Sequence, residues 1–155
     1  CIFIVDRDHD PDLQYTKYPI ASEDKNHICR TKGYSFENYF LNPAIMAKLG
    51  VIKSESDFYK IFLQKWKEYL NRIRSGIHLK QIMGYDLQSI QDVKDNMELI
   101  KRYMRGHNVF DIFYGRYKNS ETELLTKYVE LAPREDFADI LNSIDRFIIF
   151  ESRKK

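Results

Sequence analysis

The chain has 155 residues, which suits one ordinary domain, and its 43% hydrophobic content is enough to form a core. Its 25 basic and 23 acidic residues give a formal net charge of +2, so any surface for a polyanionic partner has to be local. Membrane-spanning and disulfide-framework proteins are excluded, because no apolar run is long enough and the two cysteines are too few. We therefore expect a cytoplasmic protein.

The chain opens with an apolar run that leads into alternating acidic residues, CIFIVDRDHDPD. Such a run is typical of a buried strand in an α/β sheet, and ligands bind at the carboxyl ends of those strands. Asp6, Asp8, Asp10 and Asp12 follow the run at every second position. Because like-charged carboxylates repel one another, we expect a divalent cation here. Oxygen ligands favour Mg²⁺ or Mn²⁺ over zinc.

A polar segment with two prolines, residues 9–27, predicts an irregular connection to a second short strand near residues 27–31. Ser35 then has the position of a helix N-cap. Further along, Pro43 predicts the first residue of another helix and Gly50 predicts the end of that helix.

The rest of the chain predicts mostly helices, because its apolar residues recur at three- and four-residue steps. We expect an amphipathic helix from Ser54 to Gly76 and a second helix over residues 90–106. Shorter helical segments are expected at residues 109–117 and from Ser120, where a capping box begins. Pro133 starts the last predicted helix.

A buried strand that ends in Asp-x-Asp is compatible with several chemistries. A haloacid-dehalogenase-type phosphatase uses the first Asp as a nucleophile and the second as a general acid. A nucleotide-sugar transferase uses such a pair to hold a metal-bound diphosphate. A Toprim nuclease uses the pair to bind one or two catalytic divalent ions. Acidic loop residues without a catalytic role are a fourth interpretation, and the pair alone does not decide among the four.

The second motif, TKGYSFENYF, lies about 25 residues after the acidic pair and follows the second predicted strand. Glu37, near the start of a helix, is therefore expected at the same edge of the sheet. Together, FIVDRDHD and TKGYSFENYF resemble the OLD-like Toprim nucleases. More narrowly, they resemble the domain-of-unknown-function family that includes AriB, the Toprim effector subunit of the PARIS anti-phage defence system. The resemblance covers about the first 45 residues.

The resemblance implies that Asp6, Asp8 and Glu37 are catalytic metal ligands, with Glu37 serving a second ion or positioning water. His107, which follows Gly106 in YMRGHNVF, takes the place of a family lysine. It is expected to contact phosphate or to transfer a proton. Weaker candidates for contacts with the substrate are Arg7, Arg30, Lys32 and Ser35.

The fold class expected from the resemblance is α/β, with a Toprim-like parallel sheet core followed by a mostly helical region. Residues 1–50 would form the C-terminal part of that catalytic core, and residues 51–155 would form a helical region packed on it. Toprim domains carry a further essential Glu on an earlier strand, which we expect upstream of Cys1.

The function implied by the same resemblance is a metal-dependent endonuclease that cleaves DNA or RNA as an anti-phage toxin effector. An ABC-type ATPase partner would keep it silent, and a homodimer is a further expected assembly.

Two rival interpretations stay open. In the first, the protein is a phosphatase or a nucleotidyl-transferring enzyme with Asp6 as nucleophile, and it forms a covalent aspartyl-phosphate. In the second, it is a non-catalytic subunit whose apolar helix faces dock an ATPase. That interpretation predicts that neutralising Asp6 and Asp8 leaves function and assembly unchanged.

Overall fold

The computed structural model describes residues 3–5 and 28–153. Two short strands, β1 (Phe3–Val5) and β2 (Ile28–Arg30), pair in parallel, with Val5 opposite Arg30. Both strands lie where the sequence predicts strands. Because the strands are parallel, both end at the same edge of the pair.

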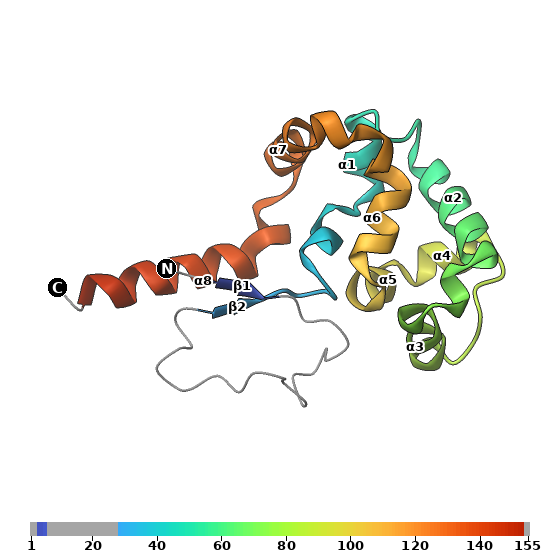
Figure 1. Cartoon of the computed structure of the whole chain (residues 1–155), viewed down its shortest axis with the longest axis horizontal. Helices are drawn as coiled ribbons and strands as arrows, with labels where there is room; N and C mark the ends of the chain where they lie inside the picture. Colours follow the sequence, from blue (N-terminus) through green and yellow to red (C-terminus); the bar gives the residue numbers. More distant parts are fainter. Residues whose placement is uncertain (1–2, 6–27, 154–155) are drawn as a thin grey trace.

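The predicted parallel sheet core is wrong. In the described residues, β1 and β2 form a two-stranded sheet of three residues per strand, and most of the remaining chain is helical (Figure 1). The physical reason is the spacing of the apolar residues that follow Ser35. They recur every three or four positions, so they are buried where helices pack on helices, and the core does not need a sheet.

Helices follow one another along the chain after β2, and the segments labelled η are 3₁₀ helices. In chain order they are η2 (Phe36–Phe40), α1 (Pro43–Lys48), α2 (Glu55–Glu68), η3 (Leu70–Arg72), α3 (Arg74–Met83), α4 (Ile90–Asp95), α5 (Met97–Tyr103), α6 (Gly106–Tyr114), η4 (Gly115–Ser120), α7 (Glu121–Leu131), η5 (Arg134–Phe137) and α8 (Ala138–Arg153). Figure 1 shows α1 to α7 gathered into one body, while α8 extends away from it beside β2, which it contacts. None of the described helices is long and apolar enough to cross a membrane.

The helix predicted from Ser54 to Gly76 is divided in the structure. It begins at the expected place, but it ends at Glu68, because Tyr69 leaves the helical conformation with φ of −157°. Gly76 lies inside α3 and does not end a helix. A Cβ atom at this position would lie 1.7 Å from the Leu70 carbonyl oxygen, so Gly76 allows α3 to pack closely against η3.

The helix predicted over residues 90–106 is also divided, into α4 and α5, which meet at Asn96. The Asn96 side-chain amide donates to the Asp92 carbonyl oxygen at 2.7 Å, a local bond that competes with continued helix. Gly106 begins α6, whereas the sequence pattern places it at the end of a helix.

The predictions for α1 are confirmed. Pro43 is its first residue, and the Asn42 side chain caps it by accepting hydrogen bonds from the backbone of Ala44 and Ile45. Gly50 follows the helix with φ of +76°, a conformation that glycine adopts without steric cost.

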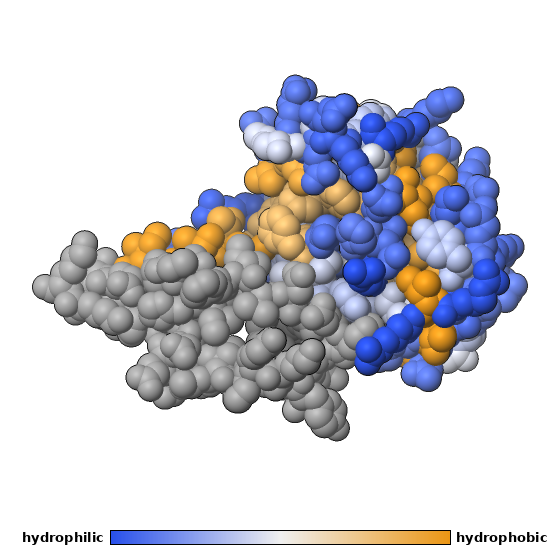
Figure 2. Space-filling model, viewed as in Figure 1, coloured by the Kyte–Doolittle hydropathy of each residue, from blue (hydrophilic) through white to orange (hydrophobic). Residues whose placement is uncertain are grey.

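One hydrophobic core joins the helices from η2 to the start of α8. Its largest fully buried side chains include Phe58, Phe62, Trp66, Leu70, Leu79, Met104, Tyr114 and Tyr128. On the face shown in Figure 2, hydrophilic residues cover much of the helical body, and apolar residues reach the surface along α8 and in a band over the right half.

Candidate functional site

The turn between β2 and η2 is held by hydrogen bonds on both sides. The Thr31 hydroxyl donates to the Gly33 carbonyl oxygen at 2.9 Å, and the Lys32 backbone N–H donates to the Tyr39 hydroxyl oxygen at 2.8 Å. The Tyr39 hydroxyl in turn donates to the Asp139 carboxylate in α8. The path from the carboxyl end of β2 into η2 is therefore tied both to itself and to α8.

Ser35 is the N-cap of η2, as the sequence predicts. The Asn38 side-chain oxygen accepts hydrogen bonds from the Ser35 backbone N–H at 3.1 Å and from the Ser35 hydroxyl at 2.9 Å. Both residues are buried. The Ser35 hydroxyl is therefore committed to the local structure of the helix start.

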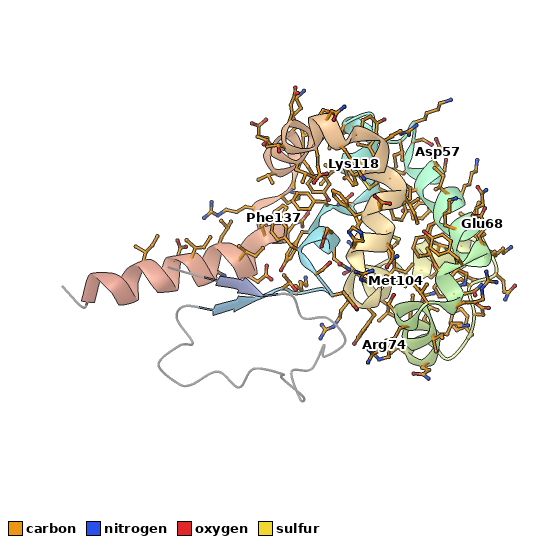
Figure 3. The ribbon with its side chains drawn as sticks, in the orientation of Figure 1. Asp57, Glu68, Arg74, Met104, Lys118 and Phe137 are labelled. Atoms are coloured by element: carbon orange, nitrogen blue, oxygen red, sulfur yellow. The ribbon has the colours of Figure 1, made fainter. Side chains whose placement is uncertain are left out.

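Asn38 also connects η2 to a distant part of the chain. Its side-chain N–H groups donate to the carbonyl oxygens of Lys101 at 2.7 Å and Met104 at 2.9 Å. These carbonyls lie at the C-terminal end of α5, where helices leave carbonyl groups without an intrahelical partner. In Figure 3, Met104 lies where α5 and α6 meet. Asn38 thus satisfies the end of α5 from outside that helix.

Two glycines allow this close contact. A Cβ atom on Gly106 would lie 2.0 Å from the Asn38 side-chain oxygen and 2.5 Å from the Ser35 hydroxyl oxygen. A Cβ atom on Gly33 would lie 2.5 Å from the Lys101 carbonyl oxygen. We call Gly33, Ser35, Asn38 and Gly106, together with the backbone of residues 101–104, the Asn38 junction. It determines how α6 meets η2.

The Asn38 junction brings Glu37 and His107 together. His107 Nδ1 lies 4.0 Å from Glu37 Oε1, with exposed side-chain fractions of 62% and 34%. This distance is longer than a hydrogen bond, and it allows an ion pair when the imidazole is protonated. Glu37 lies in the first turn of η2, where its negative charge is favourable, and His107 lies in the first turn of α6. Two of the predicted site residues, far apart in the sequence, are thus neighbours.

The other predicted residues are placed as follows. Asp6, Arg7 and Asp8 lie outside the described residues. In the sequence Asp6 follows Val5, the last residue of β1. The two strands end at the same edge, and the chain continues from the end of β2 toward Glu37. Arg30 is the last residue of β2, and the Lys32 side chain is exposed.

Within residues 3–5 and 28–153, no group of three or more His, Cys, Asp or Glu side chains is arranged to hold a metal ion. Glu37 offers carboxylate oxygens, the donors that Mg²⁺ and Mn²⁺ prefer. A complete cation site would need further carboxylates, and Asp6 and Asp8 are the residues that the sequence places after β1.

Asn38 lies in the second motif, TKGYSFENYF, but the motif does not predict the bonds from Asn38 to the end of α5. A signal was present in Gly106, because glycine inside a predominantly helical segment often marks a close approach of backbone. The sequence pattern does not predict which residue lies close to Gly106.

Comparison with protein-family models, with curated proteins and with solved structures gave no match. The resemblance to the Toprim family is thus still a prediction based on two short motifs.

Proposed function

We propose that this chain is a metal-dependent nuclease that hydrolyses phosphodiester bonds in DNA or RNA. The observation that carries the proposal is the Glu37–His107 pair, 4.0 Å apart and accessible to a ligand. A carboxylate beside an imidazole suits proton transfer and phosphate chemistry. Glu37 lies on the segment that leaves the same edge of the strand pair at which the acidic run begins in sequence, and His107 reaches it from α6.

In this proposal Asp6, Asp8 and Glu37 would hold Mg²⁺ or Mn²⁺. When bound, the cation would stabilise the negative charge that develops on the phosphate oxygens. Because residues 3–5 and 28–153 form no Toprim sheet core, the proposal is supported by the site residues and the motifs.

The residues of the pair have complementary tasks in hydrolysis. A water oxygen forms a bond to phosphorus while the bond from phosphorus to the leaving sugar oxygen breaks, and a proton has to leave the water and another has to reach the leaving oxygen. The Glu37 carboxylate can orient that water by accepting its hydrogen bond and can then take up the proton that leaves the water. His107 faces Glu37 through Nδ1, which leaves Nε2 to donate a proton toward the substrate.

The biological setting is part of the same proposal and is supported only by the motif resemblance. We propose an anti-phage effector that acts in the cytoplasm and is kept inactive by an ABC-type ATPase partner, with a homodimer as a further assembly.

The test is nucleic-acid cleavage by the intact protein, freed of any partner, with Mg²⁺ or Mn²⁺ and with DNA and total RNA as substrates. We expect Asp6→Asn, Asp8→Asn and Glu37→Gln each to lower the cleavage rate by at least ~100-fold. His107→Gln should lower it by about 100-fold, the lower range for loss of a general acid. Glu123→Gln, on an exposed carboxylate of α7, is the matched control and should leave the rate unchanged.

Three outcomes would contradict the proposal. Folded protein that cleaves neither substrate with either metal is not a nuclease of this kind. A covalent phosphate on Asp6 would instead identify a phosphatase. Unchanged function after Asp6→Asn and Asp8→Asn would indicate a non-catalytic subunit.

A further inference from the structure

A pocket of about 320 Å³ opens beside the Asn38 junction. Neither Glu37 nor His107 lines it, so it is separate from their pair. Its walls come from the turn after β2, η2, α5 and the region of α7 and η5. The lining residues are Lys32, Gly33, Asn38, Tyr39, Asn42, Glu98, Leu99, Lys101, Arg102, Tyr128 and Asp136.

Cations outnumber anions in this lining, because Lys32, Lys101 and Arg102 face only two carboxylates. One of these, Glu98, is 85% exposed and pairs with Lys101 at 3.2 Å. Such an exposed ion pair contributes little to the stability of the folded protein, so an anionic ligand can replace Glu98 as the partner of Lys101. The Lys32 ammonium forms no ion pair with the residues that the structure describes.

Two neutral polar side chains of the pocket, Asn38 and Tyr128, already form hydrogen bonds within the protein. All four hydrogen-bonding positions of the Asn38 side chain are occupied by Ser35, Lys101 and Met104. The Tyr128 hydroxyl oxygen accepts from the Asn42 backbone N–H at 3.0 Å, and burial raises the pKa of Tyr128 so that it stays neutral. With three cations against two carboxylates, the lining carries a small net positive charge, which suits a phosphate better than the edge of a base.

We infer that this pocket binds a phosphate-bearing nucleotide unit of the substrate strand, next to the bond that is cleaved. Its volume lies at the lower end of the range for ligand pockets, which suits one nucleotide. Asn38 lines the pocket, and the adjacent residue, Glu37, belongs to the pair described above, so a strand held in the pocket passes close to Glu37 and His107. This assignment deepens the proposed function and rests on it.

This inference can be tested separately from catalysis by measuring binding in the absence of divalent cations, where metal-dependent cleavage cannot take place. We would measure fluorescence anisotropy of labelled single-stranded DNA and RNA of about 12 nucleotides, in EDTA and at ~50 mM salt, with the intact protein. Lys32→Gln and Lys101→Gln should each weaken binding about five- to tenfold and reduce the slope of log affinity against log salt by about 0.7. Lys118→Gln, on an exposed lysine of η4, is the matched control and should change neither quantity.

The second arm uses AMP as a competitor, because a free nucleotide carries the same phosphate chemistry as a strand. AMP that competes only at concentrations far above those of the oligonucleotide supports a strand site. AMP that binds as tightly as the oligonucleotide, with the same dependence on Lys32, would overturn the assignment in favour of a free nucleotide. If Lys32→Gln and Lys101→Gln bind the oligonucleotide as tightly as Lys118→Gln, the assignment of the pocket is wrong. If the unchanged protein binds the oligonucleotide through Lys32 but does not cleave nucleic acid, only the proposed nuclease activity is wrong.

Discussion

The aromatic core around α2 and the Asn38 junction hold the same molecule together by different means. In the core, Phe58, Phe62 and Trp66 are fully buried, and the ring of Phe58 stacks on that of Phe113 at 4.6 Å. Such contacts are non-directional, and they tolerate other apolar residues of similar volume. At the junction, Asn38 takes part in four hydrogen bonds to fixed partners. The core therefore supplies stability, while the junction sets the position of Glu37 relative to His107.

The largest expected effect is in the core. Phe62→Ala should lower the free energy of unfolding by about 3–5 kcal/mol, because it removes a fully buried ring and leaves a cavity. Activity per folded molecule should stay close to that of the unchanged protein. Urea unfolding and the cleavage assay measure the two quantities. Val129→Ala, at a side chain that is 50% exposed, is the control and should change stability by less than about 0.5 kcal/mol.

The next effect is at the centre of the junction. Asn38→Asp keeps the shape of the side chain, but it removes the donors to the Lys101 and Met104 carbonyls and brings a carboxylate against them. We expect a loss of about 3 kcal/mol in the free energy of unfolding, and a loss of cleavage even in the fraction that stays folded. Asn119→Asp, on an exposed residue, should change neither quantity. Full cleavage activity in folded Asn38→Asp protein would show that the Asn38 junction, like the core, contributes only to stability.

A smaller effect is expected for Gly106→Ala. The added methyl group would meet Asn38 and Ser35 side-chain oxygens at 2.0 and 2.5 Å, so α6 has to move away from η2. We expect a loss of about 2 kcal/mol in stability and a slower cleavage rate. Gly115→Ala is the matched control, since its Cβ would meet the Asp111 carboxylate oxygen at 3.1 Å, and that flexible side chain can move. Equal behaviour of the two variants would argue against close packing at Gly106.

The smallest effect is a dependence on alkaline pH. Burial raises the pKa of the Tyr114 and Tyr128 hydroxyls, so both stay protonated in the folded protein at a pH where an unfolded tyrosine ionises. Stability should be constant up to about pH 10 and should then fall by about 1.4 kcal/mol per pH unit for each tyrosine. Tyr114→Phe should make the decline shallower, and it should cost about 1 kcal/mol at neutral pH by removing the hydrogen bond to the Phe40 carbonyl. Urea unfolding between pH 8 and pH 11 tests both effects. An unchanged slope in Tyr114→Phe would show that the buried Tyr114 hydroxyl does not cause the decline.

Local patterns predicted a good part of the chain. The strands at residues 3–5 and 28–30, the N-cap at Ser35 and the ends of α1 agree with the sequence-based expectations. Each depends on the conformational preferences of a few consecutive residues, and these preferences act wherever the segment lies in the fold. Of the candidate site, Glu37 and His107 were named from motifs, but the spacing of these motifs does not predict that the two side chains are neighbours.

What only the tertiary structure decided is which distant segments meet. The apolar periodicity predicted the helices, whereas the tertiary structure decided that these helices pack mainly on one another in the described residues and not on a larger sheet. Likewise, Gly76 and Gly106 read as helix ends in the sequence, whereas both permit close contacts with backbone or side chains elsewhere. The sequence by itself determined where η2, α1, α2, α4 and α7 begin, because caps and periodicity are local. The Glu37–His107 pair and the basic pocket depend on contacts made across the fold, which no local pattern encodes.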